Sequence, residues 1–374
     1  MDCYLDYNAE TPIKPAVREA MAEAIGWVGN PSSVHGFGRR ARRAVEMARD
    51  RVAALAGAAP GEVIFTSSGT EANNLALKGT GRRRLLVSAI EHDSVLGAAP
   101  DARILPVDHH GVVDLEALRE ALAEDGPPAL VSLMLANNET GAIQPIAEAG
   151  RLARQHGALL HCDAVQAPGR MAIDRLGLGI DLLSLSAHKM GGPQGVGALI
   201  LGDGVALEPQ LAGGGQELGR RAGSENAVGI HGFGVACELA AEDLADTARI
   251  ARLRDRMETE ISALGGVLIA AGAARLCNTA CIAMPTMPSE TQVMAFDLAG
   301  IAVSAGSACS SGKVGPSHVL NAMGIDQALA SRAVRISLGW RTTAGDIERV
   351  IEGWAVLHSQ GSRGAATSRQ SVFK

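Results

Sequence analysis

The stretch SLSAHKMGGPQGVGALIL, residues 184–201, places a lysine between an apolar run and a glycine-rich turn. The run up to Ala187 is typical of a buried strand, and Lys189 follows where that strand ends. Ligands of open α/β sheets bind at such strand ends, and glycines let a ligand approach the backbone. The position therefore suits a lysine that forms a Schiff base with a carbonyl cofactor. An ordinary exposed loop lysine is equally compatible with this stretch alone.

Apolar runs alternate with helical patterns through most of the chain. Strands are predicted at 62–66, 84–89, 102–107, 129–135 and 158–163, and helices from Glu71, over 114–124 and over 145–156. This alternation predicts an α/β fold with a mostly parallel sheet that is covered by helices on both faces.

The pattern changes in the second half of the sequence. Helical spacing dominates from about residue 224 to 263, and short strands follow at 267–270, 279–284, 301–303 and 333–337. A chain of 374 residues also exceeds one ordinary core. We predict a large domain of residues 15–250 and a smaller α/β domain built from residues 1–14 and 251–374.

The composition argues against several classes of protein. A net charge of −6 disfavours direct binding of nucleic acid. No apolar run reaches membrane-spanning length, so no membrane association is expected, and the opening MDCYLDYNAE does not resemble a signal peptide. Six cysteines in 374 residues are too few for a disulfide framework, which favours a reducing, cytoplasmic location.

The motif HCDAVQ, residues 161–166, ends another predicted strand. Asp163 is placed to pair with a protonated pyridine nitrogen, as pyridoxal 5′-phosphate (PLP) requires when its ring accepts electrons. Gln166, three residues later, is a candidate donor to the ring oxygen. A helix-capping Asp163 is the more ordinary interpretation of this motif alone.

The motif TSSGTEANN, residues 66–74, leads from a strand through small residues into a helix. Free backbone N–H groups and the positive end of the helix suit a phosphate, with Gly69 and Thr70 as donors. Many strand–turn–helix units share part of this pattern, so the motif alone is only moderately specific.

Two further residues suit a substrate site. His92, in AIEHDSV (89–95), follows a predicted strand and can stack on a cofactor and move protons, or simply cap a helix. Arg335 opens the strand RISLGW (335–340). Its guanidinium suits a bidentate clamp on a substrate carboxylate, although a surface salt bridge is the plainer interpretation.

Cys309 lies in VSAGSACSSGKVGPSHVL, residues 303–320, where serines and glycines leave no secondary-structure pattern. Long patternless stretches inside a domain usually carry function, and the nearby Lys313 favours the thiolate. We therefore expect a nucleophilic thiol on a mobile loop. The alternative is an incidental loop cysteine.

Together these motifs closely resemble the cysteine desulfurases of the NifS/IscS type, which are PLP-dependent class V aminotransferases of the aspartate-aminotransferase fold. The shared stretches run in order from LDYNAETP through TSSGTEANN, DAVQ and SAHKMGGPQGVGAL to SAGSACSSGKVGPSHVL and RISLG. The resemblance implies that L-cysteine is converted to L-alanine while Cys309 becomes a persulfide. It also implies a homodimer and transfer of the sulfur to an acceptor or iron–sulfur scaffold protein, for iron–sulfur cluster assembly.

The resemblance implies a role for each matching residue. Lys189 matches the lysine that binds PLP covalently, Cys309 the persulfide-forming nucleophile, and His92 the stacking acid/base. Asp163 and Gln166 match the contacts to the ring. The phosphate contacts match Gly69, Thr70, Ser186, His188 and, reaching in from the other subunit, Ser224. Asn138 and Arg335 match groups near the substrate carboxylate.

The chain departs from the family pattern in four places. Glu10 and Leu218 stand where the family has Thr and Arg, and Ser224 replaces a Thr but keeps the hydroxyl. The segment after His92 looks short. These departures affect loop and subunit contacts rather than the chemistry.

Other assignments stay open at this point. One is a selenocysteine lyase or another class V reaction, although transamination would need no thiol at Cys309. Another is a non-catalytic scaffold for sulfur assembly, which intact Lys189 and Asp163 disfavour. No resident metal is predicted, because Cys277 and Cys281 lack a second ligand pair. Cys309 is at most a transient ligand of an iron–sulfur cluster.

Overall fold

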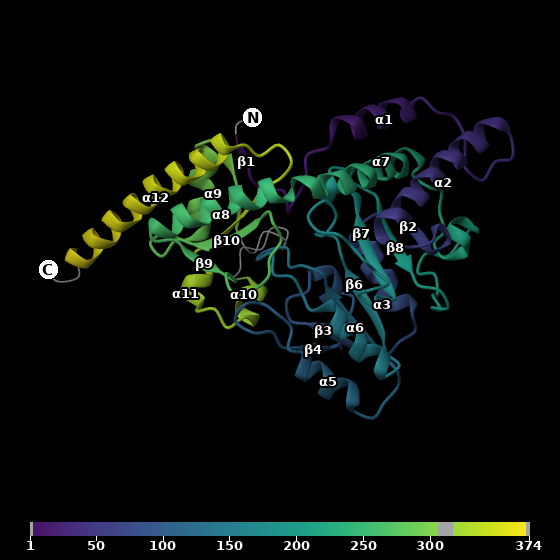
Figure 1. Ribbon diagram of the computed structural model, residues 1–374, viewed down its shortest axis with the longest axis horizontal. Coiled ribbons are helices and arrows are strands. Elements are labelled where there is room, and N and C mark those ends of the chain that lie inside the picture. The colour runs from purple at the N-terminus through teal and green to yellow at the C-terminus, as the bar shows by residue number, and fades with distance from the viewer. Residues whose placement is uncertain (1–2, 306–316, 372–374) are drawn as a thin grey trace.

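The computed structural model describes residues 3–305 and 317–371. A seven-stranded sheet lies at the centre of the larger half of the molecule, and Figure 1 shows this half beside the smaller one. The strand order is β2 (Val63–Thr66), β8 (Gly197–Leu201), β7 (Leu182–Ser186), β6 (Leu159–Asp163), β5 (Ala129–Met134), β3 (Arg84–Ser88) and β4 (Arg103–Leu105). Within this sheet, β8 runs opposite to the other six strands, which are parallel to one another. The predicted mostly parallel α/β sheet is confirmed.

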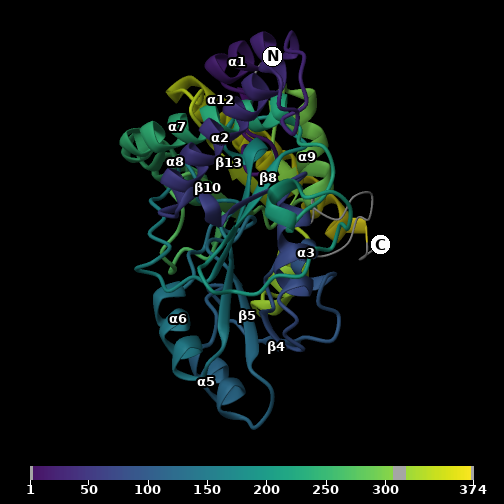
Figure 2. The same cartoon turned by 90° about the vertical axis from the view of Figure 1, so that its right-hand side faces the viewer.

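Helices cover both faces of this sheet, as the alternating pattern predicts. On one face lie α1 (Pro15–Ile25), α2 (Gly36–Ala56), α5 (Leu115–Ala123), α6 (Ile146–Gln155) and α7 (Ala227–Asp243), and on the other α3 (Gly69–Gly79) and α4 (Asp93–Leu96). Along β8, Ala198 and Ile200 pack into the hydrophobic core on the α2 and α7 face of the sheet. Leu199 and Leu201 pack into the core on the α3 face. Figure 2 shows β5 between α6 and α3.

The smaller half contains a four-stranded antiparallel sheet of order β12 (Ser304–Ala305), β13 (Ala333–Ser337), β10 (Thr279–Ala283) and β9 (Val267–Ile269). Its helices are α8 (Thr247–Ala263), α9 (Ser289–Leu298), α10 (His318–Ala322), α11 (Gln327–Ala330) and α12 (Ala344–Ser371). The helical stretch predicted over 224–263 is interrupted by a 3-10 turn, η4 (Leu244–Asp246), and leads from one half to the other (Figure 1). The domain boundaries at 14/15 and 250/251 stay a prediction.

The N-terminal segment, residues 6–11, runs between the two halves. It follows β1 (Cys3–Tyr4), which pairs with β11 (Ile301–Ala302) of the smaller half. The side chain of Asn8 donates to the carbonyl of Asn138 (3.1 Å) and to Thr279 Oγ1 (2.9 Å), and it accepts from Asn278 Nδ2 (3.0 Å). One buried amide therefore connects the larger half, the smaller half and the start of the chain.

No helix within the part of the chain that the structure describes is both long and apolar enough to cross a membrane.

The contact between α2 and α7 depends on a glycine. A Cβ at Gly234 would lie 2.7 Å from Ala48 Cα and 2.8 Å from Ala48 Cβ, so the two helices would have to separate. Gly234→Ala should lower the free energy of unfolding by about 1–3 kcal/mol, measured by urea denaturation. Gly61→Ala is the matched control, because a Cβ there meets nothing within 4 Å. Equal stability of the two variants would contradict close packing at Gly234.

Candidate active site

A cavity of about 250 Å³ opens where the strands β3, β5, β6 and β7 end. Nine of the residues singled out from the sequence line it: Gly69, Thr70, His92, Asn138, Asp163, Gln166, Ser186, His188 and Lys189. Ser224 is exposed and does not line the cavity of its own chain. Cys309, with Lys313, lies outside the described residues. The chain therefore brings most of the expected site together through strand ends that are far apart in sequence.

Lys189 is held by the N-terminal segment. It lies in a short 3-10 turn, η2 (Ala187–Met190), directly after β7. Its Nζ donates to the carbonyl oxygens of Asn8 and Ala9, both at 2.7 Å. Thr11 Oγ1 donates to the carbonyl oxygen of Lys189 (2.8 Å). Gly191 then turns the chain in the left-handed region (φ 78°), where a Cβ would meet Lys14 Cγ at 2.9 Å. The glycine-rich turn thus lets the N-terminal segment pack against the lysine.

Asp163 ends β6 and is almost fully buried. Its Oδ2 accepts from Asn73 Nδ2 (2.7 Å), and its Oδ1 accepts from the backbone N–H of Val165 (3.0 Å). Sequence reasoning assigned no role to Asn73. The available signal was its spacing, since it follows Gly69 by four residues and so shares a face of α3 with the helix start.

A buried histidine lies behind Asp163 on the same face of β6. His161 lies between the hydroxyls of Ser132 (2.8 Å) and Ser184 (2.9 Å). Burial lowers the pKa of His161 to about 4, so the ring is neutral near pH 7. This arrangement supports the strand end without adding a second charge beside Asp163.

The start of α3 forms a compact turn against β7. The side chain of Ser68 caps the helix by accepting from the N–H of Glu71 (3.1 Å). A Cβ at Gly69 would lie 2.9 Å from Val165 Cγ2 and 3.4 Å from Ser186 Cβ, so a larger residue would crowd the cavity. The first N–H groups of a helix lack intrahelical partners, so those of Gly69 and Thr70 are suitable donors to a phosphate.

His92 combines the two interpretations that the sequence left open. It caps α4, because its Nδ1 accepts from the N–H of Ser94 (3.1 Å), and it also lines the cavity. Since Nδ1 accepts, the proton of the neutral ring lies on Nε2. The stretch after His92 that looked short contains the four-residue helix α4.

Arg335 is buried rather than part of a surface salt bridge. In β13 it is 1% exposed, and its Nη2 pairs with Asp6 Oδ1 at 2.8 Å. Its Nη1 donates to the carbonyl of Asn138 (3.1 Å), whose residue lines the cavity. The guanidinium is therefore fixed beside the cavity by two partners from the larger half and the N-terminal segment.

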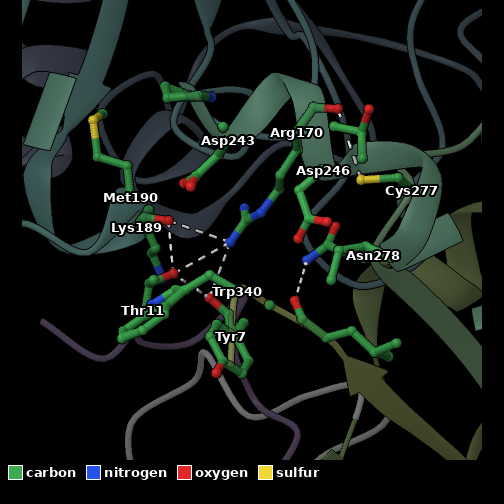
Figure 3. A pocket seen from close by; sticks show the side chains of 16 residues that line it. Tyr7, Thr11, Arg170, Lys189, Met190, Asp243, Asp246, Cys277, Asn278 and Trp340 are labelled. Atoms are coloured by element: carbon green, nitrogen blue, oxygen red, sulfur yellow. Dashed lines mark hydrogen bonds between the residues drawn. The ribbon is translucent and has the colours of Figure 1, made fainter. Parts of the chain in front are cut away.

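A second, smaller cavity of about 50 Å³ backs Lys189 (Figure 3). Arg170 lies in it and donates to the carbonyls of Tyr7 (3.1 Å) and Lys189 (3.3 Å), and also to Gln166 Oε1. The Nε2 of Gln166 then donates to the carbonyl of Asn8 (3.0 Å). Arg170, which sequence reasoning missed, thus fixes which end of the Gln166 amide carries the donor.

The remaining cysteines that the structure describes form no metal site, and one of the departures from the family pattern reaches the cavity. The five described cysteines are free thiols, and no three His, Cys, Asp or Glu side chains within residues 3–305 and 317–371 gather as a metal site. Leu218 is 74% exposed and has a left-handed backbone (φ 58°). Glu10 is different, because its Oε2 lies 2.5 Å from Nδ1 of His188 in the cavity wall.

A family model described as aminotransferase class-V matches residues 3–350. The chain belongs to the class-V aminotransferase family.

Relatives of this class-V aminotransferase carry a more specific name. The chain is 45% identical over 365 residues to a cysteine desulfurase of Rhodobacter capsulatus, and the match covers 93% of this chain and 94% of the relative. It is 40% identical over 375 residues to the cysteine desulfurase IscS of Dictyoglomus turgidum, covering 94% and 95%. The expected membership of the NifS/IscS-type cysteine desulfurases, a family of enzymes, is confirmed.

Solved structures agree with these relatives. A NifS-like protein from Rickettsia africae matches with a TM-score of 0.90 and 36% identity, over 96% of this chain and 100% of that one. A structure of SspA in complex with cysteine matches with a TM-score of 0.79 and 34% identity, over 90% and 98%. The expected PLP-dependent transferase fold is therefore confirmed.

The cavity of this class-V aminotransferase fits PLP, the cofactor of the family. A lysine amine suits the cofactor's aldehyde, the buried carboxylate of Asp163 suits a pyridinium, and the start of α3 suits a phosphate. The buried Oδ1 of Asn73 has no hydrogen-bond partner among the described residues, which is consistent with a polar ligand in this cavity. The lysine, the carboxylate and the start of α3 line the same cavity, so one ligand can contact all three.

Glu91, next to His92, is a buried carboxyl with an unusual proton affinity. Its Oε1 accepts from Ser88 Oγ (2.6 Å) and from the N–H of Met134 (2.8 Å), which ties the ends of β3 and β5 together. Burial raises the pKa of Glu91 from 4.5 to about 8. The folded protein therefore holds a proton on Glu91 at neutral pH that the unfolded chain releases.

This proton makes stability depend on pH in a defined direction. Between pH 4.5 and about 8 the folded state binds the extra proton, so the contribution of Glu91 falls as pH rises. Glu91→Gln removes the titration. Its stability relative to the wild type should rise by at least about 1 kcal/mol between pH 5 and pH 8, measured by urea unfolding. The exposed Glu120→Gln is the control, and a pH-independent difference for Glu91→Gln would contradict a protonated carboxyl.

Proposed function

We propose that the chain acts as a cysteine desulfurase that takes sulfur from L-cysteine, releases L-alanine and holds the sulfur as a persulfide on Cys309. The observation that carries the proposal is the single cavity that Lys189, Asp163 and the start of α3 share. The relatives named cysteine desulfurase, and the neighbouring structure with cysteine, support L-cysteine as the substrate.

Each residue of the cavity has its own role in holding PLP or in moving a proton. When bound, PLP supplies an electron sink at the α-carbon of the substrate. Lys189 would hold the cofactor covalently, and its amine, once free, would be the base for the α-proton of the substrate. Asp163, oriented by Asn73, would keep the pyridine nitrogen protonated, and Gln166, oriented by Arg170, would donate to the ring oxygen. His92 would cover the ring and exchange protons through Nε2.

The phosphate of PLP and the carboxylate of L-cysteine need separate partners. Gly69, Thr70, Ser186 and His188 hold the phosphate, and Ser224 of a second subunit completes this set. Asn138 and Arg335 orient the substrate carboxylate. The buried Arg335–Asp6 pair supports this role, because a guanidinium that is already desolvated and fixed loses little freedom when a carboxylate arrives.

Sulfur transfer needs the thiolate of Cys309. It attacks the sulfur of bound cysteine, so a sulfur–sulfur bond forms while the carbon–sulfur bond breaks. The electron pair of the broken bond stays with carbon, which takes up a proton and leaves as alanine. An acceptor thiol later removes the outer sulfur of the persulfide.

The residues that flank the Cys309 segment support its access to the cavity. On one side, Ser304 Oγ donates to Asp6 Oδ2 (3.1 Å), the carboxylate that pairs with Arg335. On the other side, Ser317 Oγ donates to Glu139 Oε2 (2.6 Å), next to Asn138. Both ends of the segment are therefore anchored beside the proposed carboxylate site.

We further propose that the enzyme is a cytoplasmic homodimer that passes sulfur to an iron–sulfur scaffold protein, with Cys309 as a transient ligand of the nascent cluster. The free thiols of the described cysteines suit a reducing compartment. Four exposed apolar side chains on and between α1 and α2 suit a subunit contact: Ile25, Val28, Val34 and Phe37. The exposed Ser224 is consistent with a contact to another subunit.

The proposal is tested by removing the nucleophile. With L-cysteine and a thiol reductant, the wild type should release alanine and sulfide in equal amounts. Cys309→Ser should keep the cofactor and bind L-cysteine, but alanine formation should fall at least about 100-fold. Cys277→Ser, at the second cavity, is the matched control and should retain activity. Normal turnover by Cys309→Ser would contradict the assignment, and a preference for selenocysteine would favour the lyase.

A further inference from the structure

Glu10 makes a direct contact with a residue of the cofactor cavity. Its Oε2 lies 2.5 Å from Nδ1 of His188, and the two side chains are 36% and 27% exposed. His188 lines the cavity together with Gly69, Thr70 and Ser186. A carboxylate at position 10 is one of the places where this chain departs from the family pattern.

The contact is built into the backbone as well. The hydroxyl of Tyr4 donates to the carbonyl of Glu10 (2.8 Å), and the N–H of Thr11 donates to the carbonyl of His188 (3.1 Å). The N-terminal segment therefore runs alongside His188 and presents the Glu10 side chain to its ring. A charged hydrogen bond between two positioned groups is stronger than one between free surface side chains.

The contact decides which nitrogen of His188 faces the cavity. A carboxylate only accepts hydrogen bonds, so the shared proton lies on Nδ1 and Nε2 is the nitrogen left for a ligand. A neutral ring with its proton on Nδ1 would present a lone pair at Nε2, which repels a phosphate. Only the doubly protonated ring can donate to Glu10 and to a phosphate at the same time.

We propose that Glu10 is a positioning residue that acts through His188, holding its ring in the orientation and charge state that donates Nε2–H to the phosphate of the cofactor. The inference rests on the proposed phosphate role of His188. Glu10 adds a negative charge near the phosphate, but that charge is partly exposed and screened, whereas the imidazolium makes direct contact. The net effect of Glu10 on the phosphate is therefore attractive.

The test is a binding titration that does not depend on turnover. The full-length chain, stripped of cofactor, is titrated with PLP and separately with pyridoxal, which lacks the phosphate. Glu10→Gln should weaken PLP binding about two- to fivefold, as expected for a partly exposed ion pair, and leave pyridoxal binding unchanged. Glu116→Gln, which breaks an exposed pair with Arg119 on α5, is the matched control and should change neither.

A double-mutant cycle separates this inference from the proposal on which it rests. His188→Ala should weaken PLP binding, and adding Glu10→Gln to it should cause no further loss. If His188→Ala leaves PLP binding intact, the phosphate role of His188 fails. If His188→Ala weakens binding but Glu10→Gln does not, or makes it tighter, the role of Glu10 fails. An equal loss of PLP and pyridoxal affinity in Glu10→Gln would also overturn it, because a phosphate contact cannot explain that loss.

Discussion

The rest of the site depends on the hydrogen bonds that join the N-terminal segment to the turn that carries Lys189. Thr11 donates through its N–H to the carbonyl of His188 and through Oγ1 to the carbonyl of Lys189, and Lys189 Nζ donates to the carbonyls of Asn8 and Ala9. These bonds place the cofactor lysine against the N-terminal segment, which itself bridges the two halves of the molecule. The carbonyl of the buried Asn8 also accepts from Gln166 Nε2, so a shift of the segment would break several hydrogen bonds at once. The same six residues supply Asp6 to Arg335, Asn8 to Gln166 and Glu10 to His188. A short segment that contains a turn at residues 7–9 thus sets the relative positions of the cofactor, substrate and phosphate contacts.

Charge is concentrated where the chemistry needs it. Around Asp163, the neighbouring titratable groups His161 and Glu91 are both buried. Burial lowers the pKa of His161 and raises the pKa of Glu91, so each group is neutral near pH 7. A single carboxylate therefore faces the ring position without competition from a second charge. Arg335, in contrast, is buried itself and remains paired with Asp6, which is only partly buried. Such an ion pair contributes little net stability, so its value lies in holding a guanidinium at a fixed place beside the cavity.

The strands and their ends could be predicted from the sequence, because apolar runs and turn residues are local signals. Lys189, Asp163 and His92 were found in this way, each just after a run of apolar residues. Asn73, Arg170 and Asn8 were not. The spacing of Asn73 from Gly69 places both on one face of a helix, but it does not show that Asn73 contacts Asp163. The roles of Arg170 and Asn8 arise from contacts that sequence spacing does not encode. Asn8 meets Asn278, 270 residues away, and Arg170 acts by fixing the amide of Gln166. The burial of Arg335 was also missed, because the partner that pairs with it precedes it by 329 residues.

Mass spectrometry of the Cys309 peptide most directly tests the claim that this site moves sulfur from L-cysteine to the protein. The wild-type enzyme would be exposed briefly to L-cysteine without reductant. Its thiols would then be alkylated, and the protein would be digested into peptides. The account predicts one extra sulfur atom on Cys309 and none on Cys277. An unmodified Cys309 peptide, with alanine and sulfide still released, would contradict persulfide transfer through Cys309 while leaving a lyase reaction at Lys189. If neither product nor persulfide appears, the chain is not a desulfurase.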